Sequence, residues 1–322
     1  MAEGKTVCVT GATGFIASWI VKMLLERGYT VRGTIRNPEK AKYLMQFPGA
    51  NERLQLLQAD LLTPGSFDSV VQGCDGVFHT ASPVIPYDQE DVDPETQLLD
   101  PAIKGTVNVL ESCAKAKGLK RVVLTSSIGA VAYTPHRVPG AVLDESSWSD
   151  IDHNRDNKLW YVLSKTLAEK AAWDLAKQQD LDMVVVNPSG VFGPVLNDSL
   201  SMSNELLLNI LNGKSKVIPN WVIGQVGVKD VAMAHILAYE HPEAEGRYIC
   251  SERVAHFSEL FSLLAKLYPE YHIEAKQDNG PPRLAPYKLS SEKIKKLGLT
   301  FQPMEDVVHE TVTCFKDLKL LA

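Results

Sequence analysis

From the N-terminus to residue 192, short apolar runs alternate with longer stretches in which apolar residues recur every three or four positions. The short runs are typical of buried strands, and the longer stretches are typical of amphipathic helices. This alternation predicts an α/β fold whose parallel sheet is doubly wound, with helices on both faces and right-handed crossovers. The expected strands span residues 5–10, 30–35, 54–57, 76–81, 121–125 and 182–187, and the clearest helices span 19–25, 108–113 and 158–179.

A glycine-rich turn follows the first strand and opens the first helix, with the sequence GATGFIA over residues 11–17. Gly11 permits a tight turn, Gly14 lets the backbone approach a pyrophosphate, and the small Ala17 lets the helix pack closely on the sheet. Amides at the start of the helix then face the phosphates. The spacing differs from the usual Gly-x-Gly-x-x-Gly, and an ordinary strand-to-helix loop is the alternative. Its position between strand and helix predicts a Rossmann-type dinucleotide site.

The strand over residues 30–35 ends on Arg36, where an NAD site usually carries an acidic residue that binds the ribose 2′-hydroxyl. An arginine can instead donate charge-assisted hydrogen bonds to a 2′-phosphate, and Arg32, Lys40 and Lys42 add positive charge nearby. We therefore expect NADPH or NADP+ as the cofactor. The alternative interpretation is a solvated basic segment at the start of a helix.

Beyond Gly193 the alternation loosens, and proline, glycine and asparagine interrupt the remaining helical segments. We predict that residues 1–192 form a Rossmann domain and that residues 193–322 form mainly a substrate-binding lobe, with a segment near 226–240 returning to the Rossmann domain. Ligands in such folds bind beyond the carboxyl ends of the strands. The substrate pocket is expected between the loops after Gly193 and the loop at 133–138.

Tyr161 and Lys165 lie one helical turn apart on one face of an expected helix. A free tyrosine titrates near pH ~10, so a neighbouring ammonium that stabilises the phenolate suits it to exchange a proton near neutrality. Ser127 follows the strand that ends at Thr125 and is placed to hydrogen-bond a substrate carbonyl, with Ser126 as the rival for this role. Together, Ser127, Tyr161 and Lys165 predict a site that reduces a carbonyl with a nicotinamide cofactor.

Composition narrows the classes of function. The 322 residues include 33 basic and 39 acidic side chains, and the net charge of −6 suggests no nucleic-acid or anionic-membrane partner. Five cysteines lie far apart without metal-binding spacing, so we expect reduced thiols and no metal. The first residues show no secretory signal, and no apolar run approaches the ~20 residues that cross a bilayer, which favours a cytoplasmic protein. No sustained apolar stripe requires a partner chain, and a monomer is consistent with the sequence.

Four motifs occur together and resemble those of the extended short-chain dehydrogenase/reductases. They are the glycine turn at 11–17, the run TSS at 125–127, Tyr161-x-x-x-Lys165 and the run NPSGVFGP at 187–194. Within that family, the chain is most similar to the plant group that contains cinnamoyl-CoA reductases, dihydroflavonol reductases and phenylacetaldehyde reductases. The resemblance implies an NADP-dependent oxidoreductase of phenylpropanoid metabolism with catalytic Ser127, Tyr161 and Lys165.

The resemblance also implies which residues contact the cofactor. Arg36 binds the 2′-phosphate with either Lys40 or Lys42, and the sequence leaves the choice between the lysines open. Tyr161 and Lys165 serve at the nicotinamide ribose. The other implied contacts are Gly11, Thr13, Gly14, Phe15 and Ile16 in the glycine turn, Asp60 and Leu61 at the adenine, Thr80, Ala81 and Ser82 along the cofactor, Thr125, and Pro188, Gly190, Val191 and Ser203 at the nicotinamide end.

Departures from the family pattern favour a small-molecule aromatic or apolar aldehyde or ketone as the substrate. Leu206 and Asn209 stand where cinnamoyl-CoA reductases usually carry a histidine and a lysine that bind coenzyme A. Ala132 stands where dihydroflavonol reductases usually carry an asparagine that hydrogen-bonds the flavonoid. The run LWYVLSK at 159–165 is most similar to the phenylacetaldehyde reductase branch, which implies reduction of an aldehyde to the alcohol.

Four alternatives stay open. Cinnamoyl-CoA reduction and dihydroflavonol reduction are the nearest. A sugar-nucleotide epimerase, also common in the extended family, is disfavoured because Arg36 replaces the acid expected for tightly held NAD. A non-catalytic NADP-binding sensor or scaffold is disfavoured because both Tyr161 and Lys165 are present.

Overall fold

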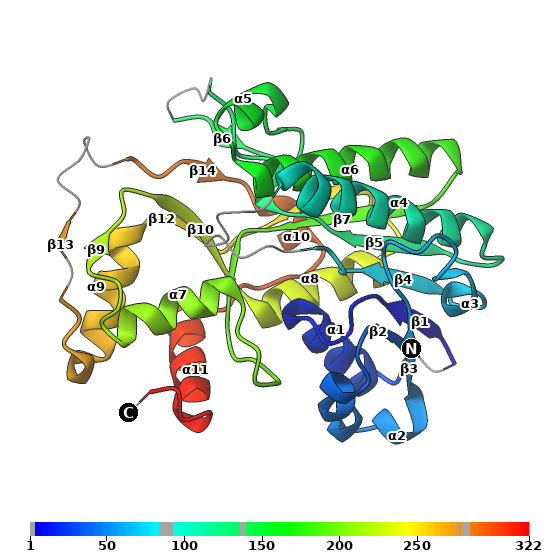
Figure 1. Cartoon of the computed structure of the whole chain (residues 1–322), viewed down its shortest axis with the longest axis horizontal. Coiled ribbons are helices and arrows are strands. Elements are labelled where there is room, and N and C mark those ends of the chain that lie inside the picture. Colours follow the sequence, from blue (N-terminus) through cyan, green and yellow to red (C-terminus); the bar gives the residue numbers. More distant parts are fainter. Residues whose placement is uncertain (1–3, 84–92, 136–139, 275, 278–283, 322) are drawn as a thin grey trace.

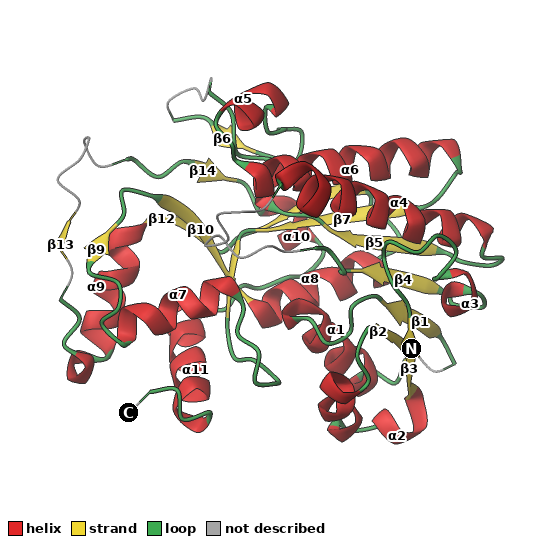
Figure 2. Ribbon diagram, in the orientation of Figure 1, coloured by secondary structure: helices red, strands yellow, loops and turns green. Residues whose placement is uncertain are grey.

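The computed structural model describes residues 4–83, 93–135, 140–274, 276–277 and 284–321. Its centre is a seven-stranded parallel sheet (Figure 1, Figure 2). The strand order is β11 (Gly246–Cys250), β7 (Met183–Pro188), β5 (Arg121–Thr125), β4 (Gly76–His79), β1 (Thr6–Val9), β2 (Thr30–Ile35) and β3 (Leu54–Gln58). Because β1 lies between β2 and β4, the winding direction reverses beside it, which is where ligands bind in such sheets. The predicted doubly wound α/β fold is confirmed.

Helices cover both faces of this sheet (Figure 1). α1 (Phe15–Glu26) and α8 (Val228–Glu240) pack together on one face, and α4 (Asp100–Lys115) and α6 (Trp160–Gln178) pack together on the other. With both faces covered, the strands are buried and read as nearly continuous apolar runs. The segment near 226–240, which was expected to return to the first domain, contains α8.

The elements after residue 193 form a second apolar cluster around three helices, α7 (Met202–Leu211), α9 (Phe257–Leu267) and α11 (Met304–Asp317). A three-stranded sheet extends towards this cluster, with the order β12 (Arg253–His256), β10 (Val222–Gly227) and β8 (Gly190–Phe192). β8 follows β7 almost directly in the chain, so the small sheet begins at the carboxyl end of the large one. The two sheets therefore meet where the site is expected.

Shorter elements complete the fold. They are η1 (Glu39–Gln46), α2 (Ala50–Arg53), α3 (Asp68–Val71), η2 (Glu95–Leu99), η3 (Ile128–Ala130), α5 (Ile151–Asp156), η4 (Pro269–Tyr271), α10 (Glu292–Lys296), and the strand pairs β9 (Val217–Ile218) with β13 (Lys276–Gln277) and β6 (Val142–Leu143) with β14 (Lys288–Leu289). Within the described ranges, no helix has the length and apolar character needed to cross a membrane.

The helix that carries Tyr161 begins later than predicted. Lys158 has a φ of 55°, a left-handed backbone that cannot belong to a right-handed helix, so α6 starts at Trp160. Tyr161 consequently falls in the first turn of α6. Part of the loop at 133–138, predicted to line the substrate pocket, lies outside the described residues.

Candidate active site

The turn after β1 packs directly against the residues that follow β4. Gly11 has a φ of +64°, and a Cβ at this position would lie 3.1 Å from the Cβ of Ala81. Glycine is suited both to this left-handed backbone and to so close an approach. Gly14 is exposed, and no side chain caps the N-terminus of α1. The amides of Gly11 and Ala12 bond to Thr34, and that of Gly14 bonds to the Gly11 carbonyl. The uncapped first amides of α1 are therefore the groups that can bind a phosphate. The partly buried side chains around the turn are Thr13, Phe15 and Ile16.

Thr10 joins β1 to the end of β4 through its hydroxyl. Its Oγ1 accepts hydrogen bonds from the amides of Thr80 (3.1 Å) and Ala81 (3.0 Å) and lies 2.9 Å from His79 Nδ1. Because two amides already donate to this oxygen, the hydroxyl proton points to Nδ1, and the imidazole proton is on Nε2. Burial, together with the charge of Lys165, lowers the pKa of His79 to about 3, so the ring is neutral.

The basic residues in and after β2 differ in whether another group of the protein already binds them. Arg36 and Lys40 are exposed at the end of β2 and the start of η1, whereas Lys42 forms an ion pair with Glu39. Arg32 does not join them. Its Nη1 donates to two backbone carbonyls at the end of α3, at 3.0 and 2.7 Å, so Arg32 supports the sheet and is not available to a 2′-phosphate.

Asp60 and Leu61 follow β3 at the same edge of the sheet. Asp60 Oδ1 accepts the amide of Leu62 at 2.8 Å, so the exposed carboxylate stabilises its own turn. The carbonyl of Leu61 accepts a hydrogen bond from Asn108 of α4 at 2.7 Å. The loop that was predicted to border the adenine is therefore held at both residues.

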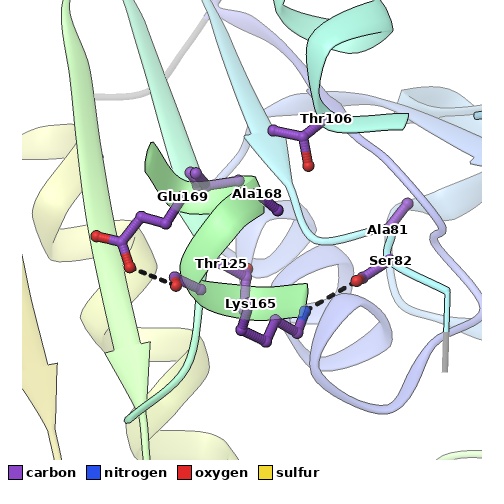
Figure 3. A pocket seen from close by; sticks show the side chains of 9 residues that line it. Ala81, Ser82, Thr106, Thr125, Lys165, Ala168 and Glu169 are labelled. Atoms are coloured by element: carbon purple, nitrogen blue, oxygen red, sulfur yellow. Dashed lines mark hydrogen bonds between the residues drawn. The ribbon is translucent and has the colours of Figure 1, made fainter. Parts of the chain in front are cut away.

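α6 presents Tyr161 in its first turn and Lys165 one turn later. Lys165 Nζ lies 5.8 Å from the centre of the Tyr161 ring and donates a hydrogen bond to Ser82 Oγ at 2.9 Å (Figure 3). Burial lowers the pKa of Lys165 to about 8, and the negative charge of Glu169 opposes this shift. The lysine thus keeps its positive charge at neutral pH, close to the phenol.

The two serines after β5 have different partners. Ser126 Oγ donates to Glu169 at 2.5 Å, which occupies its proton. Ser127 Oγ accepts the Gly129 amide at 3.0 Å and keeps its proton for another acceptor. A Cβ built on Gly129 would lie 3.3 Å from Ser127 Oγ and 3.6 Å from the Cα of Val162, so this hydroxyl neighbours the first turn of α6. The geometry favours Ser127 over Ser126 as the serine that contacts a substrate.

A buried ion pair lies behind these serines. Arg247 Nε donates to Glu169 Oε1 at 2.6 Å, and both side chains are almost fully buried. The second oxygen, Oε2, accepts hydrogen bonds from Ser126 at 2.5 Å and from Asn187 Nδ2 at 2.8 Å. The guanidinium also stacks on Trp148, 3.9 Å from the ring centre. The pair thus connects α6, β11, β7 and the turn after β5.

Thr125, the last residue of β5, is oriented by a second buried histidine. Its Oγ1 lies 2.7 Å from His235 Nε2, and His235 Nδ1 lies 2.7 Å from the carbonyl of Val231. A carbonyl can only accept, so Nδ1 carries the ring proton and Nε2 accepts the proton of Thr125. Burial lowers the pKa of His235 to about 4. The threonine hydroxyl is therefore an acceptor for any other group that approaches it.

The residues predicted at the nicotinamide end come from three elements. Pro188 ends β7, Gly190 and Val191 begin β8, and Ser203 lies in the first turn of α7. A Cβ at Gly190 would lie 2.8 Å from the carbonyl oxygen of Gly224, so glycine at this position lets β8 pair closely with β10.

A small cavity lies between Lys165 and the ends of β4 and β5 (Figure 3). Its volume of about 10 Å³ is enough for roughly one water molecule. It brings the predicted residues Ala81, Ser82, Thr125 and Lys165 together. The complete lining is Ala81, Ser82, Thr106, Leu124, Thr125, Ser126, Lys165, Ala168 and Glu169.

These features fit a dinucleotide that lies across the carboxyl edge of the sheet. The glycine turn leads into the uncapped N-terminus of α1, Arg36 adds charge at the end of β2, and Lys165 lies beyond β4 and β5. A phenol beside an ammonium at this edge adds the means to exchange a proton with a substrate. Fold and site together define a nicotinamide-dependent oxidoreductase of the short-chain dehydrogenase/reductase type.

The chain belongs to the NAD dependent epimerase/dehydratase family, whose model matches residues 7–250. It is 52% identical to a cinnamoyl-CoA reductase from Medicago truncatula over 98% of this chain and 97% of that one. It is similar to the crystal structure of vestitone reductase from alfalfa, Medicago sativa (36% identity, TM-score 0.83, 98% and 99% of the chains). It is also similar to the NADPH complex of Gre2 from Candida albicans (32% identity, TM-score 0.86, 97% and 99%). The predicted membership of the extended family, near the plant reductases, is confirmed.

Several residues of this site were not predicted from the sequence. Glu169 carries a signal that could have been read, because it follows Lys165 by four residues and so lies on the same face of the helix. Arg247 lies 78 residues beyond its partner, and no local pattern marks the pairing. Thr10 and His235 resemble ordinary strand and helix residues until the fold brings their partners close.

We expect Thr10→Val to lower the free energy of unfolding by about 1–3 kcal/mol, because two buried amides and His79 Nδ1 lose their shared partner. Thr10→Ser keeps the hydroxyl and should lose less than about 1 kcal/mol. Urea unfolding measures both values. Equal losses in the two variants would show that the methyl group matters as much as the hydroxyl, and an unchanged stability of Thr10→Val would refute the role of the hydroxyl.

Proposed function

We propose that this protein is an NADPH-dependent carbonyl reductase that converts an aromatic or apolar aldehyde or ketone into the alcohol. The observation that carries the proposal is the placement of Tyr161 beside Lys165, with 5.8 Å between the ring centre and Nζ. Bound NADPH supplies the hydride. Ser127 orients the carbonyl oxygen, Tyr161 donates a proton to it, and Lys165 stabilises the phenolate that remains.

The positive charge at the end of β2 supports NADPH over NADH. Arg36 is exposed at the position where an NAD site usually carries an acidic residue. A guanidinium can bind a phosphate through two hydrogen bonds. Lys40 is the better second partner, because Lys42 is paired with Glu39. The solved NADPH complex of the Candida relative supports the same assignment.

Two side chains support an apolar carbonyl substrate. Ala132 is fully buried in an apolar cluster with Ile128, the residue after Ser127, so this position supplies no amide to hydrogen-bond a flavonoid. Leu206 packs against the apolar cluster of α7, α9 and α11 and offers no charge to a coenzyme A phosphate. The phenylacetaldehyde reductase branch fits both features.

Cinnamoyl-CoA reduction is the second candidate. It is favoured by the 52% identity to the Medicago truncatula cinnamoyl-CoA reductase. The same tyrosine and lysine would serve that reaction, so the two candidates differ in what the substrate lobe binds and not in how a proton reaches the carbonyl oxygen.

The purified protein should oxidise NADPH faster with phenylacetaldehyde or cinnamaldehyde than with cinnamoyl-CoA or a dihydroflavonol. Tyr161→Phe should lower kcat by about 10²–10⁴-fold, because the proton donor is lost while the ring that packs in the site stays. Tyr268→Phe, which removes a hydroxyl bonded to His309 in the other lobe, is the matched control and should leave kcat unchanged. Preference for the thioester would establish the second candidate, and a fully active Tyr161→Phe would refute both.

Arg36→Leu should raise the KM for NADPH about 10- to 100-fold, since hydrogen bonds to a charged group are worth about 1.5–3 kcal/mol. The KM for NADH should stay nearly constant, because NADH lacks the 2′-phosphate. Arg27→Leu, which removes an arginine paired with Glu240 away from the site, controls for the loss of surface charge. A parallel rise for both cofactors would place Arg36 outside the phosphate site.

Carbonyl reduction should slow as the pH rises through about 8. Below that pH Lys165 is protonated and makes Tyr161 a better acid, and above it this charge is lost. Lys165→Arg keeps a charge throughout this range, so its weaker activity should decline only at higher pH. A kcat/KM profile that declines at the same pH in both proteins would assign the decline to another group.

A further inference from the structure

The turn that presents Ser127 is held by side chains from outside it. Asn187 Nδ2 donates to the Ser127 carbonyl at 3.2 Å, and the same nitrogen donates to Glu169 Oε2 at 2.8 Å. Ser126 Oγ donates to that oxygen at 2.5 Å. Arg247 Nη2 donates to the carbonyl of Ala130 at 3.3 Å, at the far end of the turn. All of these bonds lead to the ion pair of Glu169 and Arg247.

Glu169 belongs to the same helix as Tyr161. It lies eight residues later, or about two turns and 12 Å along α6. A helix is stiff over this length, so an anchor at Glu169 determines how the Ser127 turn is placed relative to the phenol. Both carboxylate oxygens are occupied, because Trp173 Nε1 also donates to Oε1, at 3.3 Å. The carboxylate consequently has a single orientation.

We propose that Glu169, held by Arg247, is a positioning residue that fixes the Ser127 turn against the helix that carries Tyr161. The inference rests on the proposed function, because it gives Glu169 a part in carbonyl reduction. Glu169 acts on the turn through Ser126 and Asn187, which both donate to its Oε2. Its charge also raises the pKa of Lys165, so its part in placing the turn is measured at a pH well below that pKa of about 8, where Lys165 is protonated. Its effect on the reaction should therefore depend on the hydroxyl of Ser127.

The chain offers a matched control at the opposite end of the same strands. Arg121, the first residue of β5, forms an ion pair with Asp182, just before β7, with 2.9 Å between Nη2 and Oδ2. Arg121 also donates to the carbonyls of Ala238, in the last turn of α8, and His241, just after it, at 3.0 and 2.7 Å. This pair ties β5 and β7 together far from Ser127, so its loss tests what a purely structural ion pair contributes.

The deciding experiment is a double-mutant cycle between Glu169→Gln and Ser127→Ala in the full-length protein, with NADPH and phenylacetaldehyde. Glu169→Gln should lower kcat about 10- to 100-fold with little change in KM, because a small misplacement of a reacting group costs that much. In the Ser127→Ala background it should cost nothing further. Asp182→Asn should leave kcat unchanged. The proposal would be overturned if the two kcat losses simply multiplied in the double mutant. It would also be overturned if Asp182→Asn lowered kcat as much as Glu169→Gln does.

Two further measurements keep the test decisive. If Glu169→Gln fails to fold, Ser126→Ala breaks one link without leaving a buried charge unpaired, and the same coupling to Ser127→Ala is required of it. If the native protein reduces no carbonyl, the proposed function fails. Amide hydrogen exchange at Gly129 and Ala130 then tests separately whether Glu169 holds the Ser127 turn in place. Faster exchange there in either variant, with α4 unchanged, supports the anchor, and unchanged exchange refutes it.

Discussion

The buried ion pair between Glu169 and Arg247 holds together four parts of the structure that the chain supplies separately. Taking two charges out of water costs several kcal/mol per ion, which mutual attraction alone does not always offset. Here the pair also has hydrogen bonds from Ser126 and Asn187 and a stacked aromatic ring at Trp148. These added partners offset the cost of burying the two charges. They also hold β5, β7, β11 and α6 in one arrangement.

The sequence predicted the parts of the site that are local, because local geometry follows from local pattern. The glycine turn at 11–17 and the one-turn spacing of Tyr161 and Lys165 needed only a strand, a turn and a helix. Where α6 begins was mispredicted, since the left-handed Lys158 has no signal in its residue type. The Glu169–Arg247 pair was missed because it depends on β11 lying beside β7, a contact that only the assembled sheet creates.

The similarity to plant reductases identifies the type of reaction more precisely than it identifies the substrate. Half of the residues are shared with a cinnamoyl-CoA reductase along almost the whole chain, and the carboxyl edge of the sheet would be common to both proteins. The proposed substrate preference rests instead on positions such as Ala132 and Leu206, where the chain carries apolar side chains packed in apolar clusters. One missing hydrogen-bond partner changes discrimination far more than it changes the fold, so overall identity is a weak guide to the substrate.

Two neutral histidines explain how this edge stays polar without becoming highly charged. His79 and His235 each accept the proton of a threonine, Thr10 and Thr125, and burial keeps both rings uncharged. The threonine oxygens are thereby fixed as acceptors, one for the backbone after β4 and one towards the cavity beside Lys165. A cationic imidazole at either place would repel the ammonium of Lys165 and weaken its hold on a proton. The neutral rings thus orient the two threonines and add no positive charge beside Lys165, which lies next to Tyr161.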